Sequence, residues 1–155
     1  MKHLFFVIYK LTFAKTHISL YVENDSCEWA FGHRGVKSYP VGSFDQEDGW
    51  KMSRLMSVGL VQDNFSIQTL VESVEKDFTV ENYELIGYNC WVFASHIMEK
   101  LNLKSHQESM KLIYKVSDFE WNVCPYTTFL VYKLLNYCKP MYNYGHAQLS
   151  SLNLI

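Results

Sequence analysis

The sequence from Tyr83 to Leu101 reads YELIGYNCWVFASHIMEKL, and the expected fold is organised around it. It opens with a short apolar run that is interrupted at Gly87. Asn89 is a typical helix N-cap, because its side-chain oxygen can accept hydrogen bonds from backbone N–H groups of the first turn. The pattern therefore predicts a helix that begins at Cys90 and extends to about Leu101.

Cys90 is the residue of this helix that suggests chemistry. Ala94, Ile97 and Leu101 follow it at helical spacing, so the thiol is predicted on the apolar, inward stripe. A thiol at a helix N-terminus faces the positive end of the helix dipole, which favours the nucleophilic thiolate. The remaining question is whether the chain supplies a base for this thiol.

The composition is that of a folded, single-domain protein. The chain has 155 residues, of which 48% are hydrophobic and 19% charged. This length suggests one domain over residues 1–155. The net charge of −2 gives no basic excess, so neither nucleic acid nor an anionic membrane surface is an expected partner. The sixteen acidic residues are interpreted as a solvated surface.

The four cysteines do not form a recognisable metal or disulfide framework. They stand at positions 27, 90, 124 and 138. Cys124, Cys138 and His146 have suitable ligand types for zinc but not the spacing, so we expect no metal and no cofactor. The apolar run at 4–9 is too short for a secretory signal, and no run has the length of a membrane span. These features favour a reduced cytoplasmic protein, with the nucleus as a second compartment.

Three strands are predicted in the first 32 residues. Residues 4–13 are rich in aromatic and β-branched types, residues 16–22 alternate, and residues 28–31 form a short piece ended by Gly32. Because the connections are short, these strands should form an antiparallel meander. The predicted class is therefore α+β.

The other predicted elements are weaker. Residues 32–50 are predicted as a loop region with a short strand at 36–41, and residues 51–56 as a strand that stops near Gly59. A helix capped by Ser66 is predicted over 66–78, and a second helix with Pro125 at its start over 125–137. Beyond Lys104 the pattern weakens, and residues 139–155 are expected to be irregular.

Among the histidines, His17 is the predicted base for Cys90. His96 lies in the same helix, but six residues place it about 9 Å along the axis and on another face. His17 stands at the entry of a strand, where a helix N-terminus can meet a sheet, and His33 in a glycine-rich loop is the second choice. A cysteine at a helix start with a distant histidine is the arrangement that thiol hydrolases use.

Four segments in order carry a resemblance to a known family. They are VIYKL (7–11), THISLYV (16–22), EWAFG (28–32) and YELIGYNCWVF (83–93). They resemble the PPPDE family of permuted papain-fold peptidases, or deSUMOylating isopeptidases, in which the active-site histidine precedes the cysteine. The resemblance covers residues 4–103 and leaves 104–155 as a divergent C-terminal segment. Lys10 replaces the family's usual Asp, and Trp91 replaces a small polar residue.

The resemblance implies a permuted papain-like fold, in which an antiparallel sheet or partial barrel packs against the helix that carries Cys90. It implies a cysteine isopeptidase that removes a ubiquitin-like modifier, SUMO or ubiquitin, from lysine. His17 would be the base in a Cys–His dyad with a thioester intermediate, and no third catalytic residue is assigned. The expected partners are the modifier and its conjugates.

Further residues are candidates for supporting roles. The backbone N–H of Cys90 can donate to the oxyanion, and Asn89 is either a second oxyanion donor or a simple cap. Gly32, Gly35 and Trp91 are candidates for lining a substrate groove. The pattern specifies neither the modifier nor the oligomeric state.

Two alternatives use the same fold. The first is a protein S-acyl thioesterase, or a lipid acyl hydrolase or transferase like the lecithin:retinol acyltransferase-like proteins, with an apolar groove around Trp91 and Phe93. The second is a binding module without catalysis, in which Cys90 is a packed core thiol.

Overall fold

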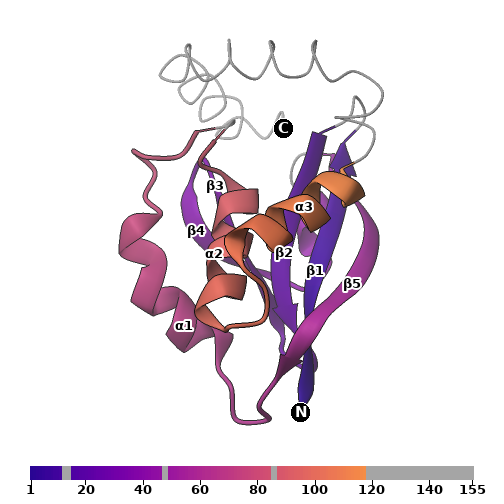
Figure 1. Ribbon diagram of the computed structural model, residues 1–155. Helices are drawn as coiled ribbons and strands as arrows, with labels where there is room; N and C mark the ends of the chain where they lie inside the picture. The colour runs from indigo at the N-terminus through magenta and orange to yellow at the C-terminus, as the bar shows by residue number, and fades with distance from the viewer. Residues whose placement is uncertain (12–14, 47–48, 85–86, 118–155) are drawn as a thin grey trace.

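The computed structural model describes residues 1–11, 15–46, 49–84 and 87–117 (Figure 1). The predicted helix at 125–137 and the expected irregular tail lie outside the described residues.

Within the described residues, five antiparallel strands form one sheet. They are β1 (Lys2–Leu11), β2 (Lys15–Val22), β3 (Cys27–Gly32), β4 (Gly35–Pro40) and β5 (Lys51–Val61). Their order across the sheet is β4-β3-β2-β1-β5. The predicted meander of the first three strands is confirmed, and the first strand of the chain occupies an interior position of the sheet.

In the part of the chain that the structure describes, three α-helices lie on one face of this sheet (Figure 1). They are α1 (Ile67–Val74), α2 (Cys90–Lys100) and α3 (His106–Val116). The 3-10 turn η2 (Glu75–Asp77) follows α1, whereas the 3-10 turn η1 (Ser43–Gln46) lies on the opposite face, where Phe44 packs against Val7, Tyr9 and Trp50. The predicted cap of the first helix is confirmed, because the Ser66 side chain accepts a hydrogen bond from the Thr69 N–H. Helix α2 packs against β2, β3 and α3. The structure is therefore an α+β fold with a helical layer on an antiparallel sheet.

The alternation of side chains along β1 separates two apolar layers. Phe6 and Ile8 belong to the main core between the sheet and the helices. Val7 and Tyr9 point to the opposite face and form a smaller cluster with Trp50. All five side chains are buried, so this strand is covered on both faces.

The sequence pattern predicted that the fifth strand stops near Gly59, and this prediction was wrong. Strand β5 continues to Val61, and Gly59 pairs with Leu4 of β1 inside the ladder. A Cβ atom at position 59 would come within 2.8 Å of a Leu103 methyl carbon. Glycine is therefore used here for close packing against the segment that follows α2, not to end the strand.

Helix α3 was not predicted, although a local signal for it exists. The Ser105 side chain accepts from the Glu108 N–H, and the Glu108 carboxylate accepts from the Ser105 N–H, which together make a capping box. The stripe that follows includes the buried Ile113 and Val116. The expectation that the pattern fades beyond Lys104 was wrong for this segment.

Candidate active site

Helix α2 begins at Cys90 with the predicted cap. The Asn89 side-chain oxygen accepts hydrogen bonds from the N–H groups of Trp91, at 3.0 Å, and Val92, at 3.4 Å. The Cys90 side chain faces the main core and is 8% exposed. The prediction of an inward thiol in the first turn of the helix is therefore confirmed.

Trp91 fixes the start of this helix to the start of β2. Its indole Nε1–H donates to the backbone carbonyl of Thr16 at 3.1 Å, and its ring meets Tyr114 of α3 edge-on at 5.8 Å. The indole is almost fully buried. Trp91 thus links α2, β2 and α3, and Thr16 directly precedes His17.

His17 is buried on the second face of the sheet. It pairs with Tyr9 across the β1–β2 ladder, and the two rings lie 5.9 Å apart. Its Nε2 lies 3.1 Å from the Ser19 hydroxyl, two residues along the same strand. Its ring is stacked on Phe44 of η1, with centroids 3.8 Å apart and planes at 7°.

A buried carboxylate, which the sequence interpretation missed, supports this cluster. Glu28 is fully buried, and both of its oxygens lie 2.7 Å from the Tyr9 hydroxyl, which donates to the carboxylate. The backbone N–H of Gly42 donates to the same group at 3.1 Å. Glu28 therefore anchors the segment that leads to Phe44 and the His17 ring. The sequence signal for this burial is the position of Glu28 within an otherwise largely apolar strand, Cys27–Gly32.

Gly32 and Gly35 close a tight hairpin, not a long loop. They pair with each other at the end of the β3–β4 ladder, with His33 and Arg34 between them. Gly35 has a φ of +86°, which favours glycine. The predicted loop region at 32–50 is thus largely ordered by β4 and η1, and the predicted short strand at 36–41 corresponds to β4.

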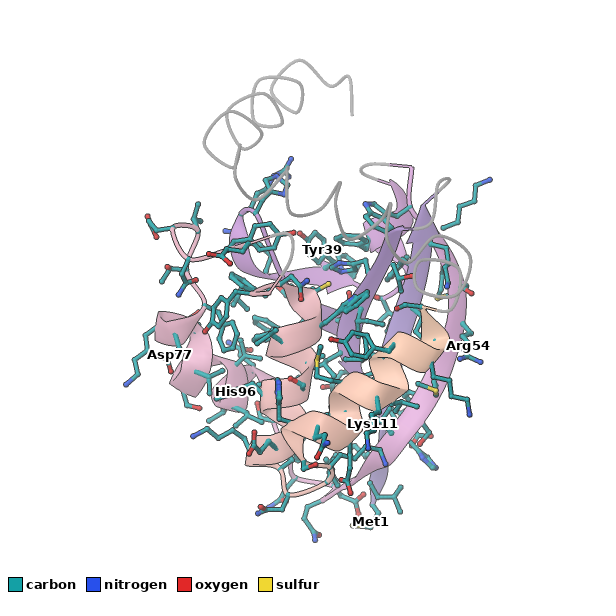
Figure 2. The ribbon with its side chains drawn as sticks, turned by 45° about the horizontal axis from the view of Figure 1, so that its top comes forward. Met1, Tyr39, Arg54, Asp77, His96 and Lys111 are labelled. Carbon is teal, nitrogen blue, oxygen red and sulfur yellow. The ribbon has the colours of Figure 1, made fainter. Side chains whose placement is uncertain are left out.

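The start of α2 and the start of β2 lie at the same end of the sheet (Figure 1). Tyr39 lies near this end, whereas His96 lies farther along α2 (Figure 2). The His96 ring contacts Phe78 with centroids 5.4 Å apart. The buried Ser95 hydroxyl lies 2.8 Å from His106 Nδ1, where it links α2 to the first turn of α3.

The arrangement combines a thiol at a helix N-terminus with a histidine at the adjoining strand. Within the described ranges, no group of three or more His, Cys, Asp or Glu side chains is arranged to hold a metal ion. In the same ranges, no helix is long and apolar enough to cross a membrane. No model of a known protein family matches the chain, and no curated protein matches it either.

Proposed function

We propose that the protein is a cysteine isopeptidase with a permuted papain-like fold, similar to the PPPDE family. Cys90 is the nucleophile and His17 the base. One observation carries this proposal: the Trp91 indole bonds the first turn of α2 to the carbonyl of Thr16, the residue before His17. A helix N-terminus that carries a thiol is thereby held beside a strand that carries a buried imidazole.

The proposed reaction follows thiol-hydrolase chemistry. His17 takes the proton of the Cys90 thiol, and the thiolate attacks the carbonyl that joins the modifier's terminal glycine to a lysine amine. The Cys90 backbone N–H lies at the positive N-terminal end of α2, so it suits the developing oxyanion. The imidazolium then protonates the leaving amine, and water hydrolyses the thioester.

The substrate we propose is a ubiquitin-like modifier, SUMO or ubiquitin, on a protein conjugate in the cytoplasm or nucleus. The tail of such a modifier is extended and ends in small residues. Strand β4 is an edge of the sheet in the described part of the chain, and it begins at Gly35 beside Gly32. An extended tail can add to such an edge through backbone hydrogen bonds.

The first test is cleavage of SUMO and ubiquitin conjugates, or of C-terminal reporter fusions, by wild type and by Cys90→Ala. We expect the variant to lose all measurable turnover. Cys27→Ala is the matched control, because it removes a free thiol at the start of β3, and it should keep wild-type turnover. Equal turnover by wild type and Cys90→Ala would reject the proposal.

The acyl thioesterase alternative ranks second because of the position of its candidate groove residues. Phe93 is fully buried, and the Trp91 indole is engaged by Thr16 and Tyr114. A ubiquitin-like modifier with a vinyl electrophile should therefore label Cys90 more efficiently than an acyl-thioester or fluorophosphonate probe. The reverse order would favour the acyl substrate.

A binding module without catalysis predicts an inert thiol. If His17 activates Cys90, the thiol should react with iodoacetamide already below neutral pH, and His17→Ala should shift this reactivity to higher pH. His3→Ala is the control, because His3 is an exposed residue of β1 whose ring contacts the Ser57 hydroxyl. Mass spectrometry of the modified peptide separates Cys90 from the other cysteines. An inert Cys90 in wild type would favour the module.

A further inference from the structure

We infer that Ser19 is a positioning residue, whose hydroxyl accepts the Nε2–H of His17 and so directs Nδ1 to the proton of Cys90. The inference rests on the proposed pairing of Cys90 with His17, and it adds what that pairing requires. A neutral imidazole carries one N–H, so the partner of one nitrogen decides which nitrogen can act as the base.

The contact follows from the register of β2. Residues two apart in a strand point to the same face, so the side chains of His17 and Ser19 are neighbours. Their partners across the ladder, Tyr9 and Val7, are fully buried and cover the same face. Ser19 is itself fully buried, and its hydroxyl oxygen lies 3.1 Å from His17 Nε2. Water therefore does not compete for this hydrogen bond.

The stacked ring of Phe44 adds a second constraint. The Phe44 and His17 ring centroids lie 3.8 Å apart and the two ring planes differ by 7°, so Phe44 fixes the plane of the imidazole. The contact of Ser19 with Nε2 then fixes which edge of the imidazole faces Ser19. A half-turn of the ring would bring a carbon atom to Ser19 in place of Nε2. That orientation loses the hydrogen bond in a buried site, which is unfavourable.

The proton transfers are then assigned atom by atom. The Cys90 S–H proton moves to Nδ1 of His17, while the Nε2–H stays on the ring and bonded to Ser19. After attack on the isopeptide carbonyl, Nδ1 gives its proton to the lysine amine as the C–N bond breaks. Water then adds to the thioester, with one proton passing through Nδ1 to the cysteine sulfur, and the free carboxyl group and thiol are restored.

The decisive measurement is the tautomer of the neutral His17 ring, taken in the full-length Cys90→Ala variant so that the thiol cannot protonate the ring. Long-range ¹H–¹⁵N correlation spectra of histidine-labelled protein distinguish Nε2–H from Nδ1–H rings, and a His17→Gln variant identifies the signals of His17. We expect Nε2–H in Cys90→Ala. An Nδ1–H ring in that variant would overturn the inference without any variant of Ser19.

Variants extend this test to the thiol. Ser19→Ala should lower the population of the Nε2–H tautomer and slow alkylation of Cys90 at neutral pH by roughly three- to tenfold, the effect of one hydrogen bond. Ser19→Thr retains the hydroxyl and should restore both readouts. The matched control is Phe44→Leu, which removes the stacked ring and should leave the Nε2–H tautomer in place. An unchanged tautomer in Ser19→Ala would overturn the inference.

Failure of the inference can be told from failure of the proposed function. Tautomer and alkylation rate are measured without any substrate, whereas the function is judged by cleavage of conjugates. If wild type cleaves conjugates through Cys90 but His17 is an Nδ1–H ring, the role of Ser19 is wrong and the isopeptidase stands. If the tautomer responds to Ser19→Ala but no conjugate is cleaved, the role of Ser19 stands and the isopeptidase is wrong.

Discussion

Asn89 combines a confirmed structural role with a proposed chemical one. Its side-chain oxygen caps α2 through Trp91 and Val92. Asn89→Ala should lower the free energy of unfolding by about 1 kcal/mol, because two N–H groups lose their acceptor. Asn89→Ser should restore this stability, because a serine oxygen can also cap. Urea unfolding of the three proteins measures the difference.

Turnover of the same variants separates the two roles of Asn89. Serine offers a cap but lacks the amide N–H that could donate to an oxyanion. If Asn89 only caps the helix, Asn89→Ser recovers wild-type turnover together with stability. Recovery of stability without turnover would assign the amide to the oxyanion instead.

Glu28 is the buried charge on which the second face of the sheet depends. Glu28→Gln places an amide N–H₂ where the carboxylate accepted from Tyr9 and Gly42. We expect a loss of about 1–3 kcal/mol in the free energy of unfolding, because a buried donor then faces another donor. Glu72→Gln on the exposed side of α1 is the control. Similar urea midpoints for both variants would contradict this role.

At the scale of single residues, sequence reasoning succeeds where the information is local. The cap at Asn89 and the inward thiol of Cys90 depend on neighbours within one helix. The burial of Glu28 depends on Tyr9 of another strand and on Gly42 of a later turn, and neither is visible from residue 28 alone. This is why the carboxylate was assigned to the surface.

At the scale of elements, Gly59 is the contact between β5 and the end of α2. Gly59→Ala should cost about 1–3 kcal/mol, because the added methyl overlaps the Leu103 side chain. Leu103→Ala in the same chain should make room for it. The measured quantity is the coupling free energy in a double-mutant cycle, and independent, additive losses would rule out this contact.

The turn before α2 has a predicted pH dependence through Tyr88. Burial raises the pKa of the Tyr88 hydroxyl above its ordinary value of 10.0, and the negative charge of Asp77 raises it further. The folded state thus keeps a proton that the unfolded chain loses near pH 10. This stabilisation is complete below that pH and is lost as pH rises through the folded-state pKa.

Tyr88→Phe isolates this effect, because phenylalanine keeps the ring that stacks on Phe78. Above pH 10, the free energy of unfolding should fall more steeply in wild type than in Tyr88→Phe. Thermal or urea unfolding between pH 8 and about 11 measures both slopes. Parallel slopes would show that the Tyr88 proton does not contribute.

The elements themselves were predicted unevenly. Strands β1, β2 and β3 and helix α2 follow from periodicity and caps, which are local. The end of β5 could not be predicted, because glycine often ends a strand and the packing of Leu103 is a tertiary contact. Helix α3 could have been predicted from Ser105 and Glu108, since its capping box is written in the sequence.

At the scale of the whole molecule, Trp91 joins the helical layer to the sheet. Trp91→Phe keeps an aromatic ring but removes the donor to Thr16. We expect a loss of about 1–3 kcal/mol in stability, because a buried carbonyl loses its partner. If Cys90 and His17 act together, turnover should fall more than stability alone explains, since the helix start is no longer fixed to β2.

The control for Trp91 is Trp29→Phe, the same chemical change at a partly buried position of β3. Both variants are compared by urea unfolding and by cleavage of a reporter conjugate under conditions in which each is fully folded. Equal turnover of the two folded variants would contradict the role of Trp91 in positioning the site.

The sheet order is the part of the architecture that local patterns do not contain. A meander of the first three strands is predictable from short connections, but the pairing of β5 with β1 joins residues far apart in the sequence. The same holds for the site: the resemblance predicts that His17 and Cys90 meet, and the sequence names Trp91 only as a groove candidate. The bond of Trp91 to Thr16, the contact of Ser19 with His17 and the burial of Glu28 become visible only in the three-dimensional arrangement.

The interior position of β1 has a consequence for synthesis on the ribosome. β1 emerges first, yet one of its two neighbours, β5, begins only at Lys51. Strands β1 to β4 can pair as they leave the exit tunnel, but the outer edge of β1 stays open until β5 follows. An open apolar edge invites pairing with another nascent chain. Slow translation between β4 and β5 should therefore lower the yield of soluble protein.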